Sequence, residues 1–570
     1  MKQILLIVFL FIYTLCLCQN PITNNSEWTV SNITENNALD YPNTIVYGPD
    51  NKLWITERKG KKVVSIDKDT GNKSTLLDLT SIIHQSKGQD GLMGIAIHPD
   101  LYTNINATNN YIYIAYTYDV NPADDNNDNT DDDVDRKLIV ERYQYNSSSQ
   151  ILDPSSATTI IDGLDASNDH NSGKLVIGPD MKLYYSIGDQ GANQFVNACN
   201  PIRSQDLPTS PTDYSAYKGK ILRLNLDGSV PSDNPTLNGT QSHVFSYGHR
   251  NPQGIVFGSN GKFYSSEHGG KTDDEINILE SGKNYGWPEI AGGYDNYGYA
   301  YCNWSSTPGG CTGNGFSDHN CAPGVTSMEE YDSYPSESGA PTDFLGPIGT
   351  YGSTTTSEPS GGWLSWPTVA PSSIDIYEGG SIPNWGTSLL IPSLKKGTIF
   401  RVKLNSNGDG IDGNPDLLDD SVYEEFHSSN DRYRDIAIDP DGITIYAITD
   451  NSGGTSGPSG TSSVSIQNPG VVMKIQYSGE VLGTTVFAKN EFRLYPNPAN
   501  SGFKIQFNKN SLQNIAHVNI IDMQGRLIKS KTNVNINDYI KTDILSKGVY
   551  FVNLLDVTNT VIGSSKLVKR

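Results

Sequence analysis

The segment 168–191, NDHNSGKLVIGPDMKLYYSIGDQG, places an Asp-His pair before a predicted hairpin and Gly-Asp-Gln-Gly after it. Apolar-rich runs at 174–177 and 182–187 flank Gly-Pro-Asp-Met, which suits a type I turn. If the turn is tight and unbulged, cross-strand partners have numbers that sum to 359, as 170 and 189 do, so His170 faces Asp189. Opposed Cβ atoms lie about 4.5–5.5 Å apart, so the carboxylate could orient the imidazole as a general base. A hydrogen bond that only closes the loop is the alternative.

Other residues in predicted loops could bind an anion, a cation or a hydroxyl group. Arg432 and Arg434 share a face if their segment is extended, and two adjacent guanidiniums repel unless an anionic group lies between them. Gly269-Gly270 could turn backbone carbonyls toward a ligand or a calcium ion. Loops next to other predicted strands carry Gln89, Arg250, Asn251 and Lys395. With the base and its carboxylate, this set suits oxidation of a neutral alcohol with a polyanionic, metal-bound organic cofactor.

Six related segments position these residues along the chain. Each is a turn followed by an aromatic-rich strand, and most are followed by a second strand. They are GPDNKLWITE at 48, HPDLYTNINATNNYIYIAYTY at 98, GPDMKLYYSIGD at 178, GSNGKFYSSEHG at 258, NWGTSLLIPS at 384 and DPDGITIYAITD at 439. Six such units predict an all-β, six-bladed β-propeller with long loops around one mouth of its channel. A β-sandwich is the alternative.

The chain of 570 residues divides into several predicted regions. Residues 1–18 predict a signal peptide, since one Lys precedes a short apolar run from Ile4 to Cys18. The propeller is expected over 25–477, a linker over 478–491, and a small sandwich-like C-terminal domain over 492–570, which shows no residues suited to chemistry.

The charge and the cysteines limit the partners. A formal net charge of −22 and a pI of about 4.7 argue against nucleic acid or an anionic membrane surface. Export allows disulfides among the cysteines that follow the signal peptide, and their spacing disfavours zinc. These are Cys199, Cys302, Cys311 and Cys321, whose pairing the sequence leaves open.

Several motifs in order over 25–477 resemble the soluble quinoprotein glucose dehydrogenases of the glucose/sorbosone dehydrogenase family. The motifs are GQDGLMGIAIHPD, DHNSGKLVIGPDMKLYYSIGDQGANQ, YKGKILRLNLDGSVPSDNP, GHRNPQGI, DDEINILESGKNYGWP, WPTVAPSS, IPSLKKGTIFRVKL and RYRD. The resemblance implies a six-bladed propeller that uses pyrroloquinoline quinone (PQQ) and calcium. The tail, with YPNP early and GVYFV late, resembles the C-terminal sorting domain of the type IX secretion system. That resemblance implies contact with this secretion machinery and a secreted or cell-surface protein.

The resemblance also implies roles for individual residues. His170 would take the proton of the anomeric hydroxyl, oriented by Asp189, while hydride passes from sugar C1 to quinone C5 and a lactone forms. Arg250 would contact both sugar and quinone. Sugar contacts would come from Gln89, Asp169 and Gln194, with Trp363 and Trp366 nearby. The quinone would be held by Asn251, Thr368, Lys395, Arg432 and Arg434. Calcium would bind the carbonyls of Gly269 and Gly270, and a second, structural calcium would bind Glu275, Tyr285, Asp295 and Glu330.

The sequence departs from the family pattern on the sugar side. Gly269-Gly270 stands where Gly-Pro is expected, His268 replaces a Gln, and Trp363 replaces a Tyr. The preferred sugar and the electron acceptor therefore stay open, as does a homodimer. The alternatives are a related quinoprotein that oxidises another sugar or an aldehyde, a propeller that only binds carbohydrate, and a calcium-dependent lactonase. The lactonase would need several inward carboxylates on one metal, and fewer are found.

Overall fold

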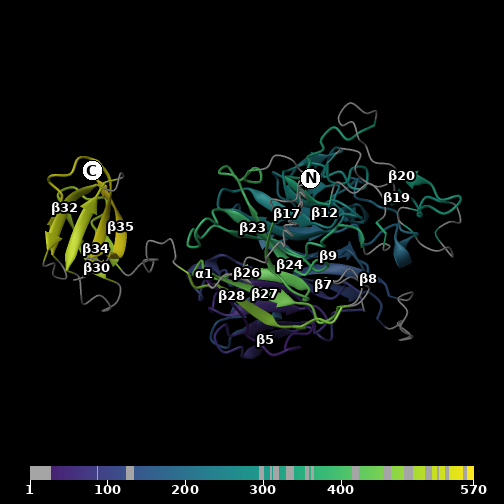
Figure 1. Cartoon of the computed structure of the whole chain (residues 1–570), viewed down its shortest axis with the longest axis horizontal. Coiled ribbons are helices and arrows are strands. Elements are labelled where there is room, and N and C mark those ends of the chain that lie inside the picture. The colour runs from purple at the N-terminus through teal and green to yellow at the C-terminus, as the bar shows by residue number, and fades with distance from the viewer. Residues whose placement is uncertain are drawn as a thin grey trace, which may run out of the picture. The chain divides into compact units, whose positions relative to one another are not determined.

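The computed structural model describes 27–86, 88–122, 134–293, 301–307, 311, 317, 320–328, 339–352, 359–360, 365–413, 423–453, 464–479, 492–507, 516–522, 526–532, 538–555 and 561–570. The chain forms two compact units, Met1–Glu480 and Val481–Arg570 (Figure 1). The predicted signal peptide, 1–18, lies outside the described residues. No helix within the described ranges is long and apolar enough to cross a membrane.

The described strands of the first unit form six four-stranded antiparallel sheets. The first three sheets are β2 (Pro42–Tyr47), β3 (Leu53–Glu57), β4 (Lys62–Ile66) and β5 (Lys73–Asp78); β6 (Leu92–Ile97), β7 (Tyr111–Asp119), β8 (Arg136–Asn146) and β9 (Ile151–Asp165); and β10 (Leu175–Ile177), β11 (Lys182–Ile187), β12 (Lys220–Asn225) and β15 (Val244–Tyr247). The other three are β16 (Pro252–Phe257), β17 (Phe263–Glu267), β18 (Asp274–Ile278) and β21 (Gly349–Tyr351); β22 (Asp375–Tyr377), β23 (Ser388–Pro392), β24 (Thr398–Lys403) and β25 (Glu424–Ser428); and β26 (Tyr433–Ile438), β27 (Thr444–Thr449), β28 (Val472–Tyr477) and β1 (Trp28–Asn32).

The six sheets close into a ring. The first strands touch in a cycle, because β2 contacts β6, β6 contacts β10, and the series continues through β16, β22 and β26 back to β2. The N-terminal strand β1 completes the last sheet, where Trp28 pairs with Tyr477 and Asn32 with Met473. The predicted all-β, six-bladed propeller is therefore confirmed.

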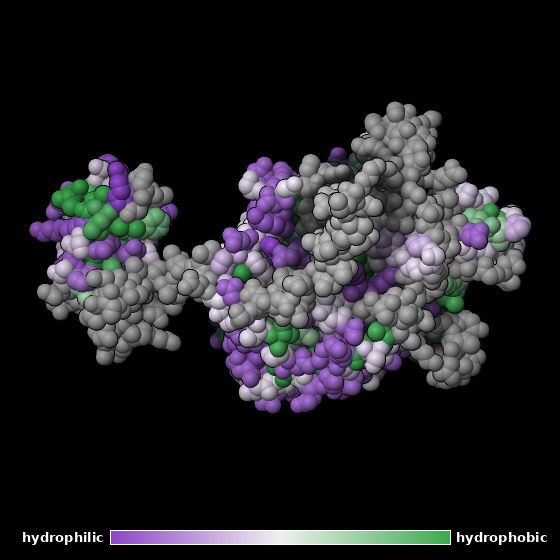
Figure 2. Space-filling model, viewed as in Figure 1, coloured by the Kyte–Doolittle hydropathy of each residue, from purple (hydrophilic) through white to green (hydrophobic). Residues whose placement is uncertain are grey.

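Apolar packing between neighbouring sheets explains why these strands are buried on both faces. Alternate side chains enter different clusters: Trp54 packs toward the second sheet, whereas Leu53 and Ile55 pack toward the last one. In the same way, Tyr184 packs toward the fourth sheet, and Tyr185 toward the second. All six neighbouring pairs of sheets share such a cluster. The described surface of this unit that is visible in Figure 2 is, by contrast, largely hydrophilic.

Short elements and two disulfides complete the first unit. The small elements are the helix α1 (Asp100–Thr103), the 3-10 helices η1 (Phe195–Asn197) and η2 (Tyr214–Tyr217), and the two-stranded sheets β13 (Thr236–Leu237) with β14 (Thr240–Gln241) and β19 (Tyr301–Cys302) with β20 (Ser327–Met328). The disulfides pair Cys199 with Cys311 and Cys302 with Cys321.

The second unit is a small sandwich, as predicted. One sheet contains β29 (Phe492–Tyr495), β30 (Gly502–Phe507) and β33 (Tyr539–Lys541), and the other contains β32 (Leu527–Thr532), β31 (His517–Ile521), β34 (Gly548–Leu555) and β35 (Val561–Lys569). Phe503 and Ile505 from the first sheet share one buried cluster with Val518, Val552 and Leu567 from the second. Side chains on the two inner faces therefore form the core.

We expect Gly254→Ala to destabilise the propeller by about 1–3 kcal/mol, the range for overpacking. Gly254 lies on β16, and a Cβ there would overlap the backbone of Ser373 and Ile374 beside the next sheet. Gly346→Ala is the matched control, because its nearest neighbours lie 3.6 Å from the added Cβ, and it should change stability by less than about 0.5 kcal/mol. Urea unfolding of both variants tests the prediction; equal effects would contradict it.

Candidate active site

A cavity of about 800 Å³ opens where loops from all six sheets meet. Twelve of the residues predicted for the site line it: Gln89, Asp169, His170, Gln194, Arg250, Gly269, Gly270, Trp366, Thr368, Lys395, Arg432 and Arg434. Asp189 and Asn251 are buried next to the cavity. Asp189 bonds to His170, which lines it, and Asn251 accepts from Ser172 in the loop that carries His170. Glu275 and Tyr285 lie outside the cavity lining, and Trp363, Asp295 and Glu330 lie outside the described residues.

The hairpin that carries the His–Asp pair differs from the prediction in register. Pairs such as Val176–Tyr184 have numbers that sum to 360 rather than 359, because Met181 adopts φ 58° and adds a residue to the turn. A bulge then compensates: Gly173 N donates to Ser186 O (3.0 Å), while Ser186 N donates to Lys174 O (3.1 Å). The two shifts cancel. His170 therefore meets Asp189 as predicted, although the unbulged ladder assumed for it was wrong.

The His–Asp contact is short and buried. His170 Nδ1 lies 2.8 Å from Asp189 Oδ1, and the two side chains are 8% and 2% exposed. Asp189 also accepts from Gly191 N (3.0 Å) and from Trp287 Nε1 (3.0 Å). A carboxylate held by these donors keeps the proton on Nδ1 and leaves Nε2 as an acceptor on the cavity side. The backbone of His170 has φ 45°, a strained conformation of the kind that clusters at functional sites.

Amide and carboxylate groups surround His170 Nε2, the ring nitrogen that does not contact Asp189. Gln194 Nε2 lies 3.3 Å from His170 Nε2 and 3.5 Å from Asp169 Oδ2. Gln89 Nε2 donates to Asp169 Oδ1 (2.6 Å). These three side chains present donors and acceptors within reach of the same point, an arrangement that suits a ligand with several hydroxyl groups.

Arg250 is supported by Trp287 and Glu267, two residues that the sequence did not single out. Its guanidinium lies 5.3 Å from the centre of the Trp287 ring, so this Trp holds both Arg250 and Asp189. Glu267 accepts from the backbone N–H of Arg250, and burial raises the pKa of this carboxyl to about 8. His268 lies beside them, and burial together with the charge of Arg250 holds its pKa well below the ordinary value, so it is neutral.

One lobe of the cavity carries more positive than negative charge. Arg434 Nη2 donates to Asp450 Oδ2 (3.2 Å), and Arg432 Nε lies 3.9 Å from the same oxygen. Arg58 adds a third guanidinium, and burial followed by repulsion from Arg434 lowers its pKa to about 10. Burial likewise lowers the pKa of Arg432 to about 10. Although burial opposes it, the three guanidiniums lower the pKa of Asp450.

Several donors in this lobe are buried without a hydrogen-bond partner. They are Nε and Nη1 of Arg432, Nε of Arg434 and Nε of Arg58. Unsatisfied buried donors cost free energy unless a ligand completes them. The lobe therefore fits an anion with several acceptor oxygens. Asp450 ends one of the repeated segments and Arg58 directly follows another, but those segments predict strands and give no sign that the two charges meet.

A third group of residues connects the cationic lobe to the Gly-Gly loop. Lys395 Nζ donates to Thr368 Oγ1 (3.0 Å), and burial lowers the pKa of this lysine to about 8. Asp274 accepts from Gly269 N (2.8 Å) and Ala370 N (2.9 Å), and burial raises its pKa to about 6. This carboxylate therefore ties the loop of Gly269 and Gly270 to the segment that carries Thr368.

Of the residues predicted for the second metal, the two that the structure describes, Glu275 and Tyr285, form hydrogen bonds within the protein. Glu275 accepts from Gly292 N (2.9 Å) and Asn277 Nδ2 (2.8 Å), and burial raises its pKa to about 8. The Tyr285 hydroxyl donates to Ile278 O (2.7 Å). Across the described ranges, no group of three or more His, Cys, Asp or Glu residues is arranged to hold a metal ion.

The propeller, whose cavity holds the buried His–Asp pair and the cationic lobe, matches a known family. The Glucose / Sorbosone dehydrogenase family matches residues 39–338 and 347–456, and the chain belongs to this family. Residues 493–570 match the Secretion system C-terminal sorting domain.

Two relatives carry dehydrogenase names, and one solved structure has a similar fold. Quinoprotein glucose dehydrogenase B of Acinetobacter calcoaceticus is 39% identical over 461 residues, which cover 78% of this chain and 90% of that protein. An aldose sugar dehydrogenase of Escherichia coli is 24% identical over 419 residues, which cover 73% and 89%. The solved apo-form of the soluble aldose sugar dehydrogenase from Escherichia coli has a similar fold, with a TM-score of 0.52 and 22% identity over 79% of this chain and 99% of that one.

We expect Arg432→Met to stabilise the ligand-free protein by about 1–2 kcal/mol, because it removes a buried charge that shares one carboxylate with two others. Asp450→Asn should instead cost about 3–5 kcal/mol, since it leaves three buried cations without their anion. Lys62→Ala, in the exposed pair with Asp78, is the control and should change stability by less than about 1 kcal/mol. The unfolding midpoints of the three variants test this prediction. Destabilisation by Arg432→Met would contradict the conclusion that the lobe carries a surplus of positive charge.

Proposed function

We propose that the protein is an exported PQQ-dependent sugar dehydrogenase that oxidises an aldose at C1 to its lactone. One observation carries the proposal: His170, held by Asp189 (2.8 Å), lines the same cavity as guanidinium donors without partners. A base and an anion-binding lobe in one cavity suit proton removal from a sugar next to an acidic oxidant. The quinoprotein name of the 39% identical relative supports the same class.

In this proposal, His170 acts as the general base. Asp189 keeps the proton on Nδ1, so Nε2 accepts the proton of the anomeric hydroxyl, and the carboxylate then stabilises the imidazolium. Trp287 keeps the carboxylate in this orientation through its 3.0 Å hydrogen bond. When bound, PQQ would supply the two-electron acceptor for the hydride of C1, and the proton of the hydroxyl goes to His170.

The sugar is held on the His170 side of the cavity. Gln89, Asp169 and Gln194 hold hydroxyl groups, because their side chains already interact with one another around His170 Nε2. Arg250 places a positive charge beside the oxygen on which negative charge develops. Trp366 lines the cavity. Trp363, which lies outside the described residues, is retained as a proposed sugar contact.

The cationic lobe and the Gly-Gly loop would hold the quinone and the first calcium ion. Arg432, Arg434 and Lys395 bind the carboxylates of PQQ, with Thr368 and Asn251 as hydrogen-bonding partners; Asn251 Nδ2 is buried without a partner. Gly269 and Gly270 offer carbonyl oxygens, the ligand type that calcium accepts. For the second calcium we retain Glu275, Tyr285, Asp295 and Glu330; the raised pKa of Glu275 supports it, because a cation would offset the cost of its buried charge.

Export is the second part of the proposal. Residues 1–18 act as signal peptide, 25–477 form the quinoprotein domain, 478–491 the linker, and 492–570 the domain that the type IX machinery recognises. The match of 493–570 to a sorting domain supports this assignment. The enzyme then acts outside the cell or at its surface, where oxidising conditions maintain the two disulfides.

A dye-linked oxidation assay tests the activity. The calcium-loaded apo-protein should oxidise aldoses only after PQQ is added, and His170→Ala should lower kcat by about 10²–10⁴-fold. His517→Ala, in the C-terminal unit, is the matched control and should leave kcat unchanged. Turnover without PQQ, or full activity of His170→Ala, contradicts the mechanism. PQQ binding without turnover of any aldose rejects the substrate, and failure to bind PQQ favours a propeller that only binds carbohydrate.

We expect the affinity for PQQ to fall as the pH rises above about 8. Burial lowers the pKa of Lys395 to about 8 in the ligand-free protein. An anionic ligand favours the charged ammonium, so this part of the affinity is present below that pKa and is lost above it. Lys395→Arg should keep the affinity nearly constant over the same range, since a guanidinium stays charged. Equilibrium titration of the apo-protein at several pH values measures the effect; an equal decline in Lys395→Arg would contradict it.

A further inference from the structure

The segment that follows Asp189 is held in a conformation that its sequence does not favour. Gln190, Asn193 and Phe195 have φ values of 63°, 63° and 45°. A left-handed backbone costs free energy at residues such as Gln190 and Phe195, so surrounding contacts must offset that cost. Gln194, which lies 3.3 Å from His170 Nε2, stands between two of these residues. Something outside the hairpin must therefore fix its position.

Asn193 provides the first fixing contact. Its side chain is 5% exposed, and its Nδ2 donates to Cys302 O (2.7 Å) while its Oδ1 accepts from Ser305 N (2.9 Å). The backbone N–H of Asn193 donates to Asn200 O (2.8 Å), which closes the loop on itself. Both ends of one amide therefore join the loop of Gln194 to a segment more than a hundred residues further along the chain.

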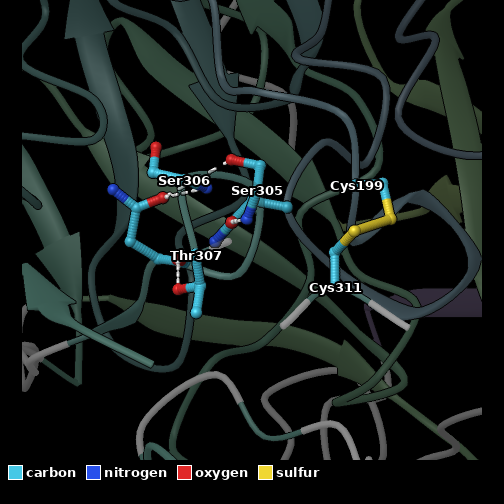
Figure 3. Close-up of a disulfide and its surroundings, with 7 residues drawn as sticks. Cys199, Ser305, Ser306, Thr307 and Cys311 are labelled. Carbon is cyan, nitrogen blue, oxygen red and sulfur yellow. Dashed lines mark hydrogen bonds between the residues drawn. A yellow bond between two sulfur atoms is a disulfide. The ribbon is translucent and has the colours of Figure 1, made fainter. Parts of the chain in front are cut away.

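The two disulfides provide the second fixing contact. Cys199, six residues after Asn193, is bonded to Cys311, and Cys302 is bonded to Cys321. Figure 3 shows the Cys199–Cys311 bond close to Ser305, the residue whose N–H reaches Asn193. Ala198 is buried in one cluster with Cys302 and Trp304. We call the described part of 301–328 the stapled segment; it contacts the loop by hydrogen bonds, a disulfide and apolar packing.

We propose that Asn193 and the Cys199–Cys311 disulfide are positioning groups that set the affinity for the sugar by fixing Gln194 beside His170. The inference rests on the proposed function, because Gln194 is assigned there to the sugar. It goes beyond that function by giving the stapled segment, which contributes no residue to the cavity lining, a role in substrate binding.

The place where the stapled segment contacts the loop predicts whether KM for the sugar or the affinity for PQQ should change. The stapled segment reaches the loop after β11, whereas the proposed quinone contacts Lys395, Arg432 and Arg434 come from the fifth and sixth sheets. Releasing the loop should therefore weaken sugar binding and leave quinone binding intact. A merely structural staple would instead lower the unfolding midpoint without separating KM from the affinity for PQQ.

Three variants test the inference. Asn193→Gly removes both amide contacts but tolerates the positive φ, Asn193→Asp keeps the acceptor for Ser305 N–H and loses the donor to Cys302, and the double variant C199S/C311S removes the covalent bond. Asn384→Gly is the matched control, since Asn384 also has a positive φ (64°) but is exposed and outside the cavity lining.

We expect KM for the best aldose to rise about tenfold in Asn193→Gly and in C199S/C311S, which is the effect of losing about 1.4 kcal/mol of binding. Asn193→Asp should give a smaller rise, and Asn384→Gly none. The affinity of each apo-protein for PQQ should stay within about twofold of the parent. An unchanged KM, or an equal loss of affinity for PQQ, overturns the proposal.

Hydrogen exchange of the ligand-free proteins separates this proposal from the proposed function. In Asn193→Gly and C199S/C311S, the amides of 190–197 should exchange faster, while those of 432–438 should not change. If the parent protein oxidises no aldose, the proposed function has failed, and the exchange result alone decides whether the stapled segment positions the loop. Unchanged exchange at 190–197 overturns the positioning role in either case.

Discussion

Every four-stranded sheet of the propeller packs against a neighbour on both faces, and the rest of the structure depends on this constraint. Alternate side chains of one strand enter two different apolar clusters, as Trp54 and Ile55 do. The polar groups of the site therefore lie in the loops at the rims or at the strand ends beside them, as Asp274 and Arg434 do. Because the six first strands form a closed ring, loops that are hundreds of residues apart in the chain meet over one cavity.

The cavity gathers groups whose burial is individually unfavourable. Three guanidiniums share Asp450, while Glu267 and Asp274 lie nearby with pKa values raised to about 8 and about 6. Burying a charge without a full set of partners costs free energy, and the apolar clusters between the sheets offset that cost. Such a site is stabilised by a ligand of complementary charge. The same reasoning explains why the aromatic Trp287, which serves both Asp189 and Arg250, is more than a core residue.

The repeats in the sequence predicted the six sheets well, because each marks the turn of a first hairpin, such as the turn between β10 and β11. The contact of His170 with Asp189 was also predictable, although two register shifts had to cancel. Arg58, Asp450 and Trp287 were not, since their roles depend on which loops the closed ring brings together. The disulfide pairing has the same origin: spacing alone could not choose Cys311 as the partner of Cys199.

Pairing of β1 with β28 has a consequence for folding kinetics. The sheet that closes the ring joins the first described strand of the propeller to its last one, with Trp28 opposite Tyr477. Contacts between such distant residues have a high entropic cost, because a long loop must close, and they slow the folding of β-proteins. Until Val472–Tyr477 is available, the strand Thr444–Thr449 keeps an open edge that another chain could pair with. The sorting domain follows this closing strand in the chain, so a molecule that carries it always contains every strand needed to complete the ring.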